Sequence, residues 1–152
     1  MKLLTGVYDS TVDDKGRFIL PSRMRQAIDS KSLYVLPGFD ENHIMMMTPA
    51  YFEDRFSQAV FSSDDAMFSE GKRNLVRRLI SPAIELDLDS AGRINIPPRM
   101  RERYELGNKT QIKIVGVGNA IEVWNASLYD EMMEREEEKE SLSDLASRLM
   151  ER

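Results

Sequence analysis

The 152-residue sequence predicts an α+β fold, a tandem and pseudo-twofold pair of small β-rich units with peripheral helices and a C-terminal helical segment. The first observation behind this prediction is an internal repeat, VDDKGRFILPSRMR at 12–25 and LDSAGRINIPPRMR at 88–101. The second is that each copy continues into two β-forming runs, separated by a glycine-containing turn and followed by a helix signal. A chain with two copies of one unit is suited to binding a repetitive partner or to assembling into rings.

The two copies of the repeat align at a constant offset. The match covers an Asp-x-x-Gly-Arg turn, the apolar run that follows it, a proline and the tripeptide RMR. Chance does not easily produce so many matches in order, so we interpret the chain as two versions of one unit. The matched turn residues are Asp13, Gly16 and Arg17 in the first copy and Asp89, Gly92 and Arg93 in the second.

The first unit opens with a predicted strand, a turn and a second strand. GVYDSTV at 6–12 alternates and is rich in β-forming residues, which is typical of a strand. DDKG at 13–16 is typical of a turn, because Gly16 can take a positive φ without a steric penalty. RFIL at 17–20 then forms the next strand, so we expect a local hairpin at this point.

The rest of the first unit is predicted to be helix, hairpin and helix. SRMRQAI at 22–28 follows a proline, which is tolerated in the first turn of a helix. LYVL at 33–36 and HIMMM at 43–47 pair as a hairpin and form strand core or an oligomer interface, with His43 as a turn residue. Thr48 is an N-cap signal for a helix over about 49–60.

The second unit repeats this plan, with Asn125 as the corresponding N-cap and Trp124 as a core or interface residue. Between the units, Leu75 and Leu79 stand at helical spacing beside basic residues, which predicts a linking helix broken near Gly71. The expected segments are a first repeat at 1–62, a basic linking helix at 63–80, a second repeat at 81–130 and an acidic C-terminal helical segment at 131–152.

The acidic charge of the chain is concentrated at its C-terminal end. The net charge is −5, yet basic and acidic residues number 11 each over 1–80, while 131–152 hold 4 basic and 8 acidic residues. The segments 15–25 and 71–79 each carry four basic residues and no acid. Basic segments in a mildly acidic protein are compatible with a polyanionic partner.

Several classes of function are excluded by composition. There is no cysteine and only one histidine, so we expect no thiol nucleophile, metal site or histidine-based triad. We read neither a signal peptide nor a membrane span, and we expect a cytoplasmic protein without cofactor or small-molecule substrate. Glu85 and Asp87 could in principle do acid/base work, but no nucleophile or glycine-rich phosphate loop accompanies them, so an enzyme is disfavoured.

Two arginines are the best candidates for DNA contact. Arg17 and Arg93 stand where a turn becomes a strand, and the planar guanidinium suits both phosphate oxygens and a guanine edge. Lys15 adds charge to the first turn, where the second has Ala91. The residues RMR on the following helices are further candidates, although solvated helix charge or interface pairing is an open alternative. The predicted DNA-binding residues are Lys15, Arg17, Arg93, Arg23, Arg25, Arg99 and Arg101.

The aspartates and glycines of the two turns are expected to orient these arginines. A carboxylate four residues before an arginine can pair with it across the turn or accept turn N–H groups, and it would repel phosphate. The alternative is that each Asp/Arg pair only closes a hairpin or joins two protomers. The predicted orienting residues are Asp13, Gly16, Asp89 and Gly92.

The whole chain resembles the MraZ family of transcriptional regulators, whose two repeats are similar to AbrB-like swapped-hairpin units. The resemblance rests on Gly6 and Tyr8, on DDKGR and DSAGR, on the basic helix between them and on LSDLASRL near the C-terminus. It implies small β-barrel or swapped-hairpin units in a nucleoid-associated homo-oligomer, a ring such as an octamer. It also implies binding of double-stranded DNA at short direct repeats upstream of the operon for division and cell-wall genes, commonly as a repressor. A ring-forming scaffold that binds protein without DNA remains the alternative.

Overall fold

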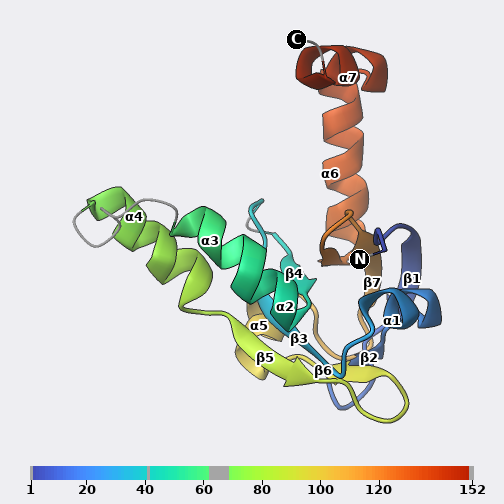
Figure 1. The fold of residues 1–152 in the computed structure, drawn as a ribbon. Coiled ribbons are helices and arrows are strands. Elements are labelled where there is room, and N and C mark those ends of the chain that lie inside the picture. Colours follow the sequence, from blue (N-terminus) through green and yellow to red (C-terminus); the bar gives the residue numbers. More distant parts are fainter. Residues whose placement is uncertain (1, 41, 62–68, 151–152) are drawn as a thin grey trace.

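The strands of the two repeats pair with each other in the computed structural model, which describes residues 2–40, 42–61 and 69–150 (Figure 1). The first repeat contains β1 (Val7–Thr11), β2 (Arg17–Ile19), α1 (Ser22–Ile28), β3 (Ser32–Pro37), β4 (Ile44–Met47), α2 (Pro49–Tyr51), the π-helical η1 (Phe52–Phe56) and α3 (Ser57–Val60). After it come α4 (Glu70–Leu75), η2 (Val76–Ile80), β5 (Ile84–Asp87), β6 (Arg93–Asn95), α5 (Pro98–Arg103), β7 (Gln111–Gly116), β8 (Ile121–Asn125), α6 (Ala126–Lys139) and α7 (Leu142–Met150).

Six strands form one antiparallel sheet in the order β1-β7-β8-β4-β3-β5. β1 of the first repeat pairs with β7 of the second, and β5 of the second pairs with β3 of the first. Strands β4 and β8 join the two halves at the centre. The α+β class is therefore confirmed. Of the two kinds of unit that the resemblance implies, barrel or swapped hairpin, a closed barrel is not formed by the described strands, which make an open sheet with β1 and β5 at its edges.

The local hairpin that DDKGR predicts is also wrong. β1 and β2, which flank this turn, do not pair with each other: β1 pairs with β7, and β2 pairs with β6 as a separate two-stranded ribbon. A strand of three residues offers too little pairing for a stable hairpin of its own. Exchange between the repeats gives each short strand a partner and brings Phe18 and Ile94, both buried, to the inner face of the ribbon.

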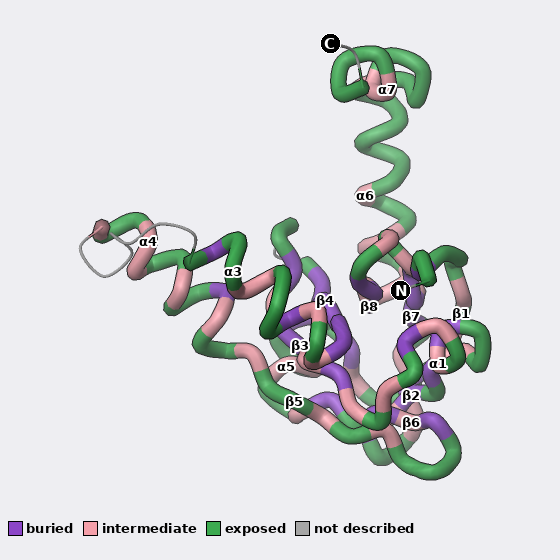
Figure 2. Tube along the Cα trace, viewed as in Figure 1, coloured by how far each residue is buried: buried purple, intermediate pink, exposed green. Residues whose placement is uncertain are grey.

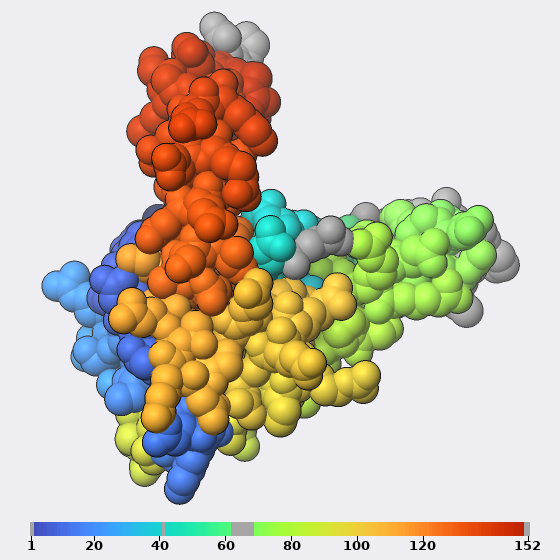
Figure 3. All heavy atoms as spheres, turned by 180° about the vertical axis from the view of Figure 1, so that it is seen from behind, coloured from blue at the N-terminus to red at the C-terminus, as the bar shows by residue number. Residues whose placement is uncertain are grey.

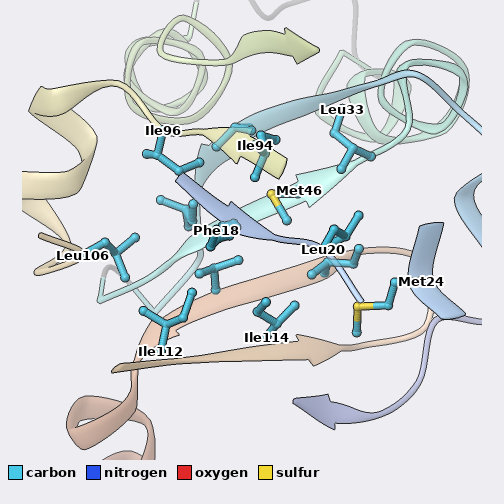
Figure 4. Packing of buried hydrophobic residues seen from close by; sticks show 14 of the residues in the cluster. Phe18, Leu20, Met24, Leu33, Met46, Ile94, Ile96, Leu106, Ile112 and Ile114 are labelled. Atoms are coloured by element: carbon cyan, nitrogen blue, oxygen red, sulfur yellow. The ribbon is translucent and has the colours of Figure 1, made fainter. Parts of the chain in front are cut away.

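One hydrophobic core collects side chains from both repeats (Figure 4). Phe18, Leu20 and Met46 of the first repeat pack with Ile94 and Ile114 of the second, and all five are buried. The limits of the predicted repeats stay a prediction, but the two share this core. Burial of apolar surface at about 25 cal/mol per Å² is the main force that holds such an intertwined pair together.

Several local predictions are confirmed. SRMRQAI forms α1, and the side chains of Thr48 and Asn125 accept backbone N–H groups as N-caps of α2 and α6. All four residues of β4 are buried, and so is Trp124. The predicted break near Gly71 is not among them, because Gly71 lies inside α4, which begins after the N-cap Ser69. The part of the linking helix predicted over 63–68 lies outside the described residues.

Two helical projections leave the sheet in different directions (Figure 1). α2 to α3 and α4 with η2 form one projection, whose base packs on β3 and β4 through a second cluster of buried residues that includes Leu36, Met47 and Leu79. α6 and α7 form the other, and Figure 2 shows it as almost wholly exposed, in contrast to the buried strands. Among the residues that the structure describes, none of the helices combines the length and apolar character needed to cross a bilayer.

Candidate nucleic-acid interface

The first Asp-x-x-x-Arg turn is closed by one carboxylate. Oδ1 of Asp13 accepts the backbone N–H groups of Lys15 and Arg17, both at 2.9 Å, and Oδ2 accepts Nε of Arg17 at 2.9 Å. Gly16 has φ of 81°, which a residue with a side chain adopts only with strain. The carboxylate therefore fixes both the turn and the arginine that follows it.

The second turn repeats this geometry. Oδ1 of Asp89 accepts the N–H groups of Ala91 and Arg93, both at 2.9 Å, and Oδ2 accepts Nε of Arg93 at 2.7 Å. Gly92 has φ of 78°. Both predicted Asp/Arg pairs thus exist as ion pairs. In each pair, Nε is the only side-chain nitrogen of the arginine that donates to the aspartate. The terminal guanidinium nitrogens of Arg17 and Arg93 donate to no other residue in the described part of the chain.

The ribbon of β2 and β6 places both arginines on one outward face. Arg17 pairs with Asn95 and Ile19 pairs with Arg93, so these four residues share a face, while Phe18 points into the core. The Arg17 and Arg93 side chains keep 23% and 35% of their surface exposed, and Ile19 keeps 52%. Arg17 and Arg93 lie diagonally across this short ribbon, so they can act on one partner.

The pKa values of the two turn carboxyls lie below their usual value of 3.8. For Asp13 the largest cause is the hydrogen bond from the backbone N–H of Arg17, which outweighs partial loss of hydration. For Asp89 the N–H of Arg93 has the same effect, and the guanidinium of Arg93 adds to it. Both carboxylates are therefore ionised at neutral pH, so that each holds Nε of its arginine as a charged partner.

Arg25 and Arg101 have a packing role between the repeats. Arg101 of the second repeat lies against Gly16 of the first, where a Cβ would overlap its guanidinium, and Arg25 lies in the same way against Gly92. Nε of Arg25 donates to the carbonyl of Leu20 at 3.0 Å, and Nε of Arg101 donates to that of Ile96 at 2.9 Å. The two glycines are thus needed for close approach as well as for their positive φ.

The other predicted DNA-binding residues lie in different surroundings. Lys15 is exposed at the first turn, and Arg23 and Arg99 are exposed on α1 and α5. Arg99 lines a groove beside α4 and η2. The structure therefore brings Lys15, Arg17 and Arg93 to the ribbon and its turns, whereas Arg99 is near a different surface feature.

Two lysines near the turns were missed by sequence reasoning. The backbone N–H of Lys109 donates to the carbonyl of Val12 at 2.7 Å, and its Nζ lies 3.8 Å from Asp14 at the first turn. The carbonyl of Lys31 accepts the N–H of Leu88 at 2.8 Å, just before the second turn. Each repeat thus brings a lysine to the turn of the other. The matching segments SKS at 30–32 and NKT at 108–110, in the shifted register after the basic helices, are the signal that could have revealed them.

His43 lies in the bend just before β4, as predicted for a turn residue, but its side chain is buried. It is 1% exposed, its ring stacks on Trp124 with centroids 4.2 Å apart, and Nε2 lies 3.3 Å from Oε2 of Glu122. Burial raises the pKa of Glu122, but the close contact with His43 and the hydrogen bond from Nε1 of Trp124 outweigh it, so the net shift is downward. This cluster lies in the body of the sheet, so it supports the fold rather than the ribbon face.

Comparison with known proteins places the chain in a family. The family model described as MraZ protein matches residues 79–152. The chain is 31% identical to the "Transcriptional regulator MraZ" of Ureaplasma urealyticum, with 97% of both chains covered. It is 34% identical to that of Treponema pallidum, over 82% of this chain and 80% of the relative, and 37% identical to that of Roseiflexus castenholzii, over 81% of both. Identity of this extent along nearly the whole sequence shows that the chain belongs to the MraZ family.

Proposed function

We propose that this protein is a sequence-specific DNA-binding transcriptional regulator that reads DNA with the outward face of its β2–β6 ribbon. The observation that carries the proposal is that Arg17 and Arg93 share this face, each held by the aspartate of its own turn with the terminal guanidinium nitrogens left for a partner. The relatives that carry the name transcriptional regulator support it.

The shape of the ribbon suits a duplex. A two-stranded antiparallel ribbon fits the major groove, where arginine donates two hydrogen bonds to O6 and N7 of guanine. Each such contact discriminates against a wrong base by about 1–3 kcal/mol. Arg17 and Arg93 are assigned to base edges or phosphates in this proposal, while Asp13 and Asp89 stay behind them as orienting groups.

Lysines at the turns supply charge for the phosphate backbone. Lys15 in the first turn, Lys109 beside it and Lys31 beside the second turn would position the ribbon without reading sequence. Arg23 on α1 is exposed and can add to this set. Arg25 and Arg101 support the two turns from behind, and this packing is the alternative to a direct contact.

The acidic segment does not oppose this assignment. Residues 131–152 carry 8 acidic and 4 basic residues, and α6 with α7 extend away from the ribbon (Figure 1). Beyond the Debye length of about 8 Å at physiological salt, exposed charges are largely screened. The projection therefore keeps most of the acidic charge from the proposed DNA face and favours one orientation of the protein on a duplex.

We further propose a homo-oligomeric ring on short direct repeats upstream of the division and cell-wall operon, where the protein acts in the cytoplasm at the nucleoid as a repressor. In a ring the ribbon face occurs many times, so weak contacts add up when the spacing of DNA repeats matches that of the subunits. The alternative, a ring-forming scaffold without DNA, is favoured by one observation, the exposed apolar residues Leu142, Leu149 and Met150 of α7.

Selection of binding sites from random duplexes at physiological salt, with the oligomer mass measured in the same buffer, tests the proposal. We expect enrichment of duplexes that carry a short motif two or more times at fixed spacing, bound by a species several times the mass of one chain. An assembled protein that enriches no sequence would contradict DNA reading and favour the scaffold.

A further inference from the structure

The one histidine of the chain is buried without a hydrogen-bond partner. His43 is 1% exposed, and neither Nδ1 nor Nε2 makes a hydrogen bond with a residue that the structure describes. Trp124 stacks on the ring, and Gly38 packs so close to it that a Cβ at position 38 would overlap Nε2. Buried polar atoms are costly to leave unpaired, so this ring indicates a missing partner, either water or an ion.

Two carboxylates from different repeats converge on this ring. Glu122 lies on β8 of the second repeat, and Asp40 lies in the turn after β3 of the first. One ligand atom from each of Asp40, His43 and Glu122 lies within 4.8 Å of the other two. Ionised carboxylates and the lone pair of a neutral imidazole all offer electrons and no proton. The missing partner is therefore a cation rather than water.

The contact between His43 and Glu122 has the spacing of two metal ligands rather than the alignment of a hydrogen bond. Two ligand atoms that are each about 2.0–2.1 Å from a tetrahedral ion lie about 3.3 Å apart. Nε2 of His43 and Oε2 of Glu122 are 3.3 Å apart. The other carboxylate oxygen, Oε1, accepts a hydrogen bond from Nε1 of Trp124 at 2.8 Å. Outer hydrogen bonds of this kind orient the ligands of metal sites.

The cluster is open to solvent on the side of Asp40. This residue is exposed, and Figure 3 shows the turn after β3, in cyan, at the surface of the molecule. An ion can therefore enter from this side, and the exposed side chain can rotate toward it. Zinc sites with three protein ligands complete their coordination with water, which this opening admits.

We propose that Asp40, His43 and Glu122 bind a divalent transition-metal ion of the Zn²⁺ type. Composition predicts no metal site, because a single histidine cannot form one alone, but two carboxylates supply the ligands that it lacks. A ring nitrogen among the ligands favours Zn²⁺ over Mg²⁺, which is bound mainly by oxygen. The ion would tie the turn after β3 to β8 of the other repeat, beside the pairing of β4 with β8 that joins the two halves. It would therefore stabilise the intertwined fold, whether or not the ribbon binds DNA.

Isothermal titration of Zn²⁺ into the full-length protein tests the site. The protein carries no histidine tag and is first stripped of metal with a chelator, which is then removed by dialysis. With no cysteine and no second histidine, the chain has few other groups that compete for the ion. We expect Zn²⁺ to bind, and the urea midpoint of unfolding to be higher with Zn²⁺ than with chelator, because an ion that binds only the folded chain stabilises it. Mg²⁺ at the same concentration should leave the midpoint unchanged.

Ligand variants assign the binding to these residues. Asp40→Asn and Glu122→Gln should each lower the affinity for Zn²⁺ by at least about tenfold. Asp40 is exposed, so its variant keeps the fold and decides the test if Glu122→Gln does not fold. Asp54→Asn, which changes an exposed acid on η1, is the matched control and should bind Zn²⁺ like the parent. The proposal is overturned if the parent binds no Zn²⁺, if a folded ligand variant binds it as tightly as the parent, or if Mg²⁺ stabilises the protein equally.

Discussion

The two Asp-x-x-x-Arg turns have the same internal hydrogen bonds but different charge. In both, one carboxylate oxygen accepts two backbone N–H groups and the other accepts Nε of the arginine. The first turn adds Lys15, where the second has Ala91, and the Arg17 side chain is less exposed than that of Arg93, at 23% against 35%. The first turn is therefore the more basic, and the second the more open.

The turns also differ in what supports them. Arg101, which lies against the first turn, donates to the carbonyl of Ile96 and to Oδ1 of Asn108. Asn108 in turn donates to the carbonyl of Asp14, so this turn is tied to the second repeat by a short network. Arg25, against the second turn, donates only to Leu20 among the described residues. The same motif therefore occurs in two settings: the first turn is held by more hydrogen bonds from its supporting arginine than the second turn is.

The largest expected effect is on stability, from Gly16→Ala. Its φ of 81° penalises any side chain, and the new Cβ would overlap the tethered guanidinium of Arg101. We expect a loss of about 2 kcal/mol or more in free energy of unfolding, measured by urea titration at fixed protein concentration. Gly92→Ala is the matched variant, and a smaller loss is expected because Arg25 can move more easily. Equal losses would contradict the difference in support.

The next effect is on DNA affinity, from Asp13→Ala. Without the carboxylate the Arg17 side chain loses its Nε partner and gains rotamer freedom, so affinity should fall several-fold. Asp13→Asn keeps an oxygen that can accept the N–H groups of the turn but removes the ion pair, so its loss should lie between those of the parent and Asp13→Ala. The same pair of substitutions at Asp89 gives the comparison. Isothermal titration with the selected duplex measures all four, and an affinity increase in Asp13→Ala would contradict the orienting role.

Substitution of the residue whose charge differs between the two turns, Lys15 or Ala91, should have a smaller effect on DNA affinity. Lys15→Ala should weaken binding to all sequences alike and reduce the slope of log K against log salt concentration by about 0.9 for each phosphate that the variant no longer neutralises. Ala91→Lys should change the slope in the opposite direction. Unchanged slopes in both variants would show that this position lies away from the phosphates.

The smallest expected effect is on stability against pH. The pKa values of Asp13 and Asp89 are lowered in the folded protein, so their stabilising effect is complete above the unfolded value of 3.8 and is lost as pH falls through the lower folded values. Removal of one carboxyl by Asp13→Asn should make the free energy of unfolding less dependent on pH below the unfolded value of 3.8. Urea titrations at several pH values measure how the free energy of unfolding depends on pH. A steeper dependence in the variant than in the parent would contradict the prediction.

Local features of the fold could be predicted from the sequence. Thr48 and Asn125 are N-caps because a short polar side chain before a helix accepts its free N–H groups, and this depends on a few neighbouring residues only. The relatives are named as transcriptional regulators, which confirms that the family is not enzymatic. The internal repeat likewise identifies the two aspartate and arginine turns as equivalent, because the matching residues follow one another in the same order in both copies.

Pairing between distant segments could not be predicted in this way. The alternation in VYDST identifies a strand but not its partner, because any strand with one apolar side satisfies the same pattern. The pairing of strands between the two repeats places Arg25 and Arg101 against the glycines of the turns. It also places Lys31 and Lys109 beside the turns. Sequence reasoning therefore identified the arginines and their aspartates but not the residues that surround them.

The central claim is that Arg17 and Arg93 contact DNA from one ribbon face, and the most direct test is the affinity of Arg17→Ala and Arg93→Ala for a duplex with the selected repeats. Each variant should lose about 10- to 100-fold in affinity, the equivalent of about 1–3 kcal/mol, with oligomer mass unchanged. Arg135→Ala, on the exposed part of α6, is the control and should bind like the parent. If both single variants and the double variant also bind like the parent, the ribbon does not contact DNA.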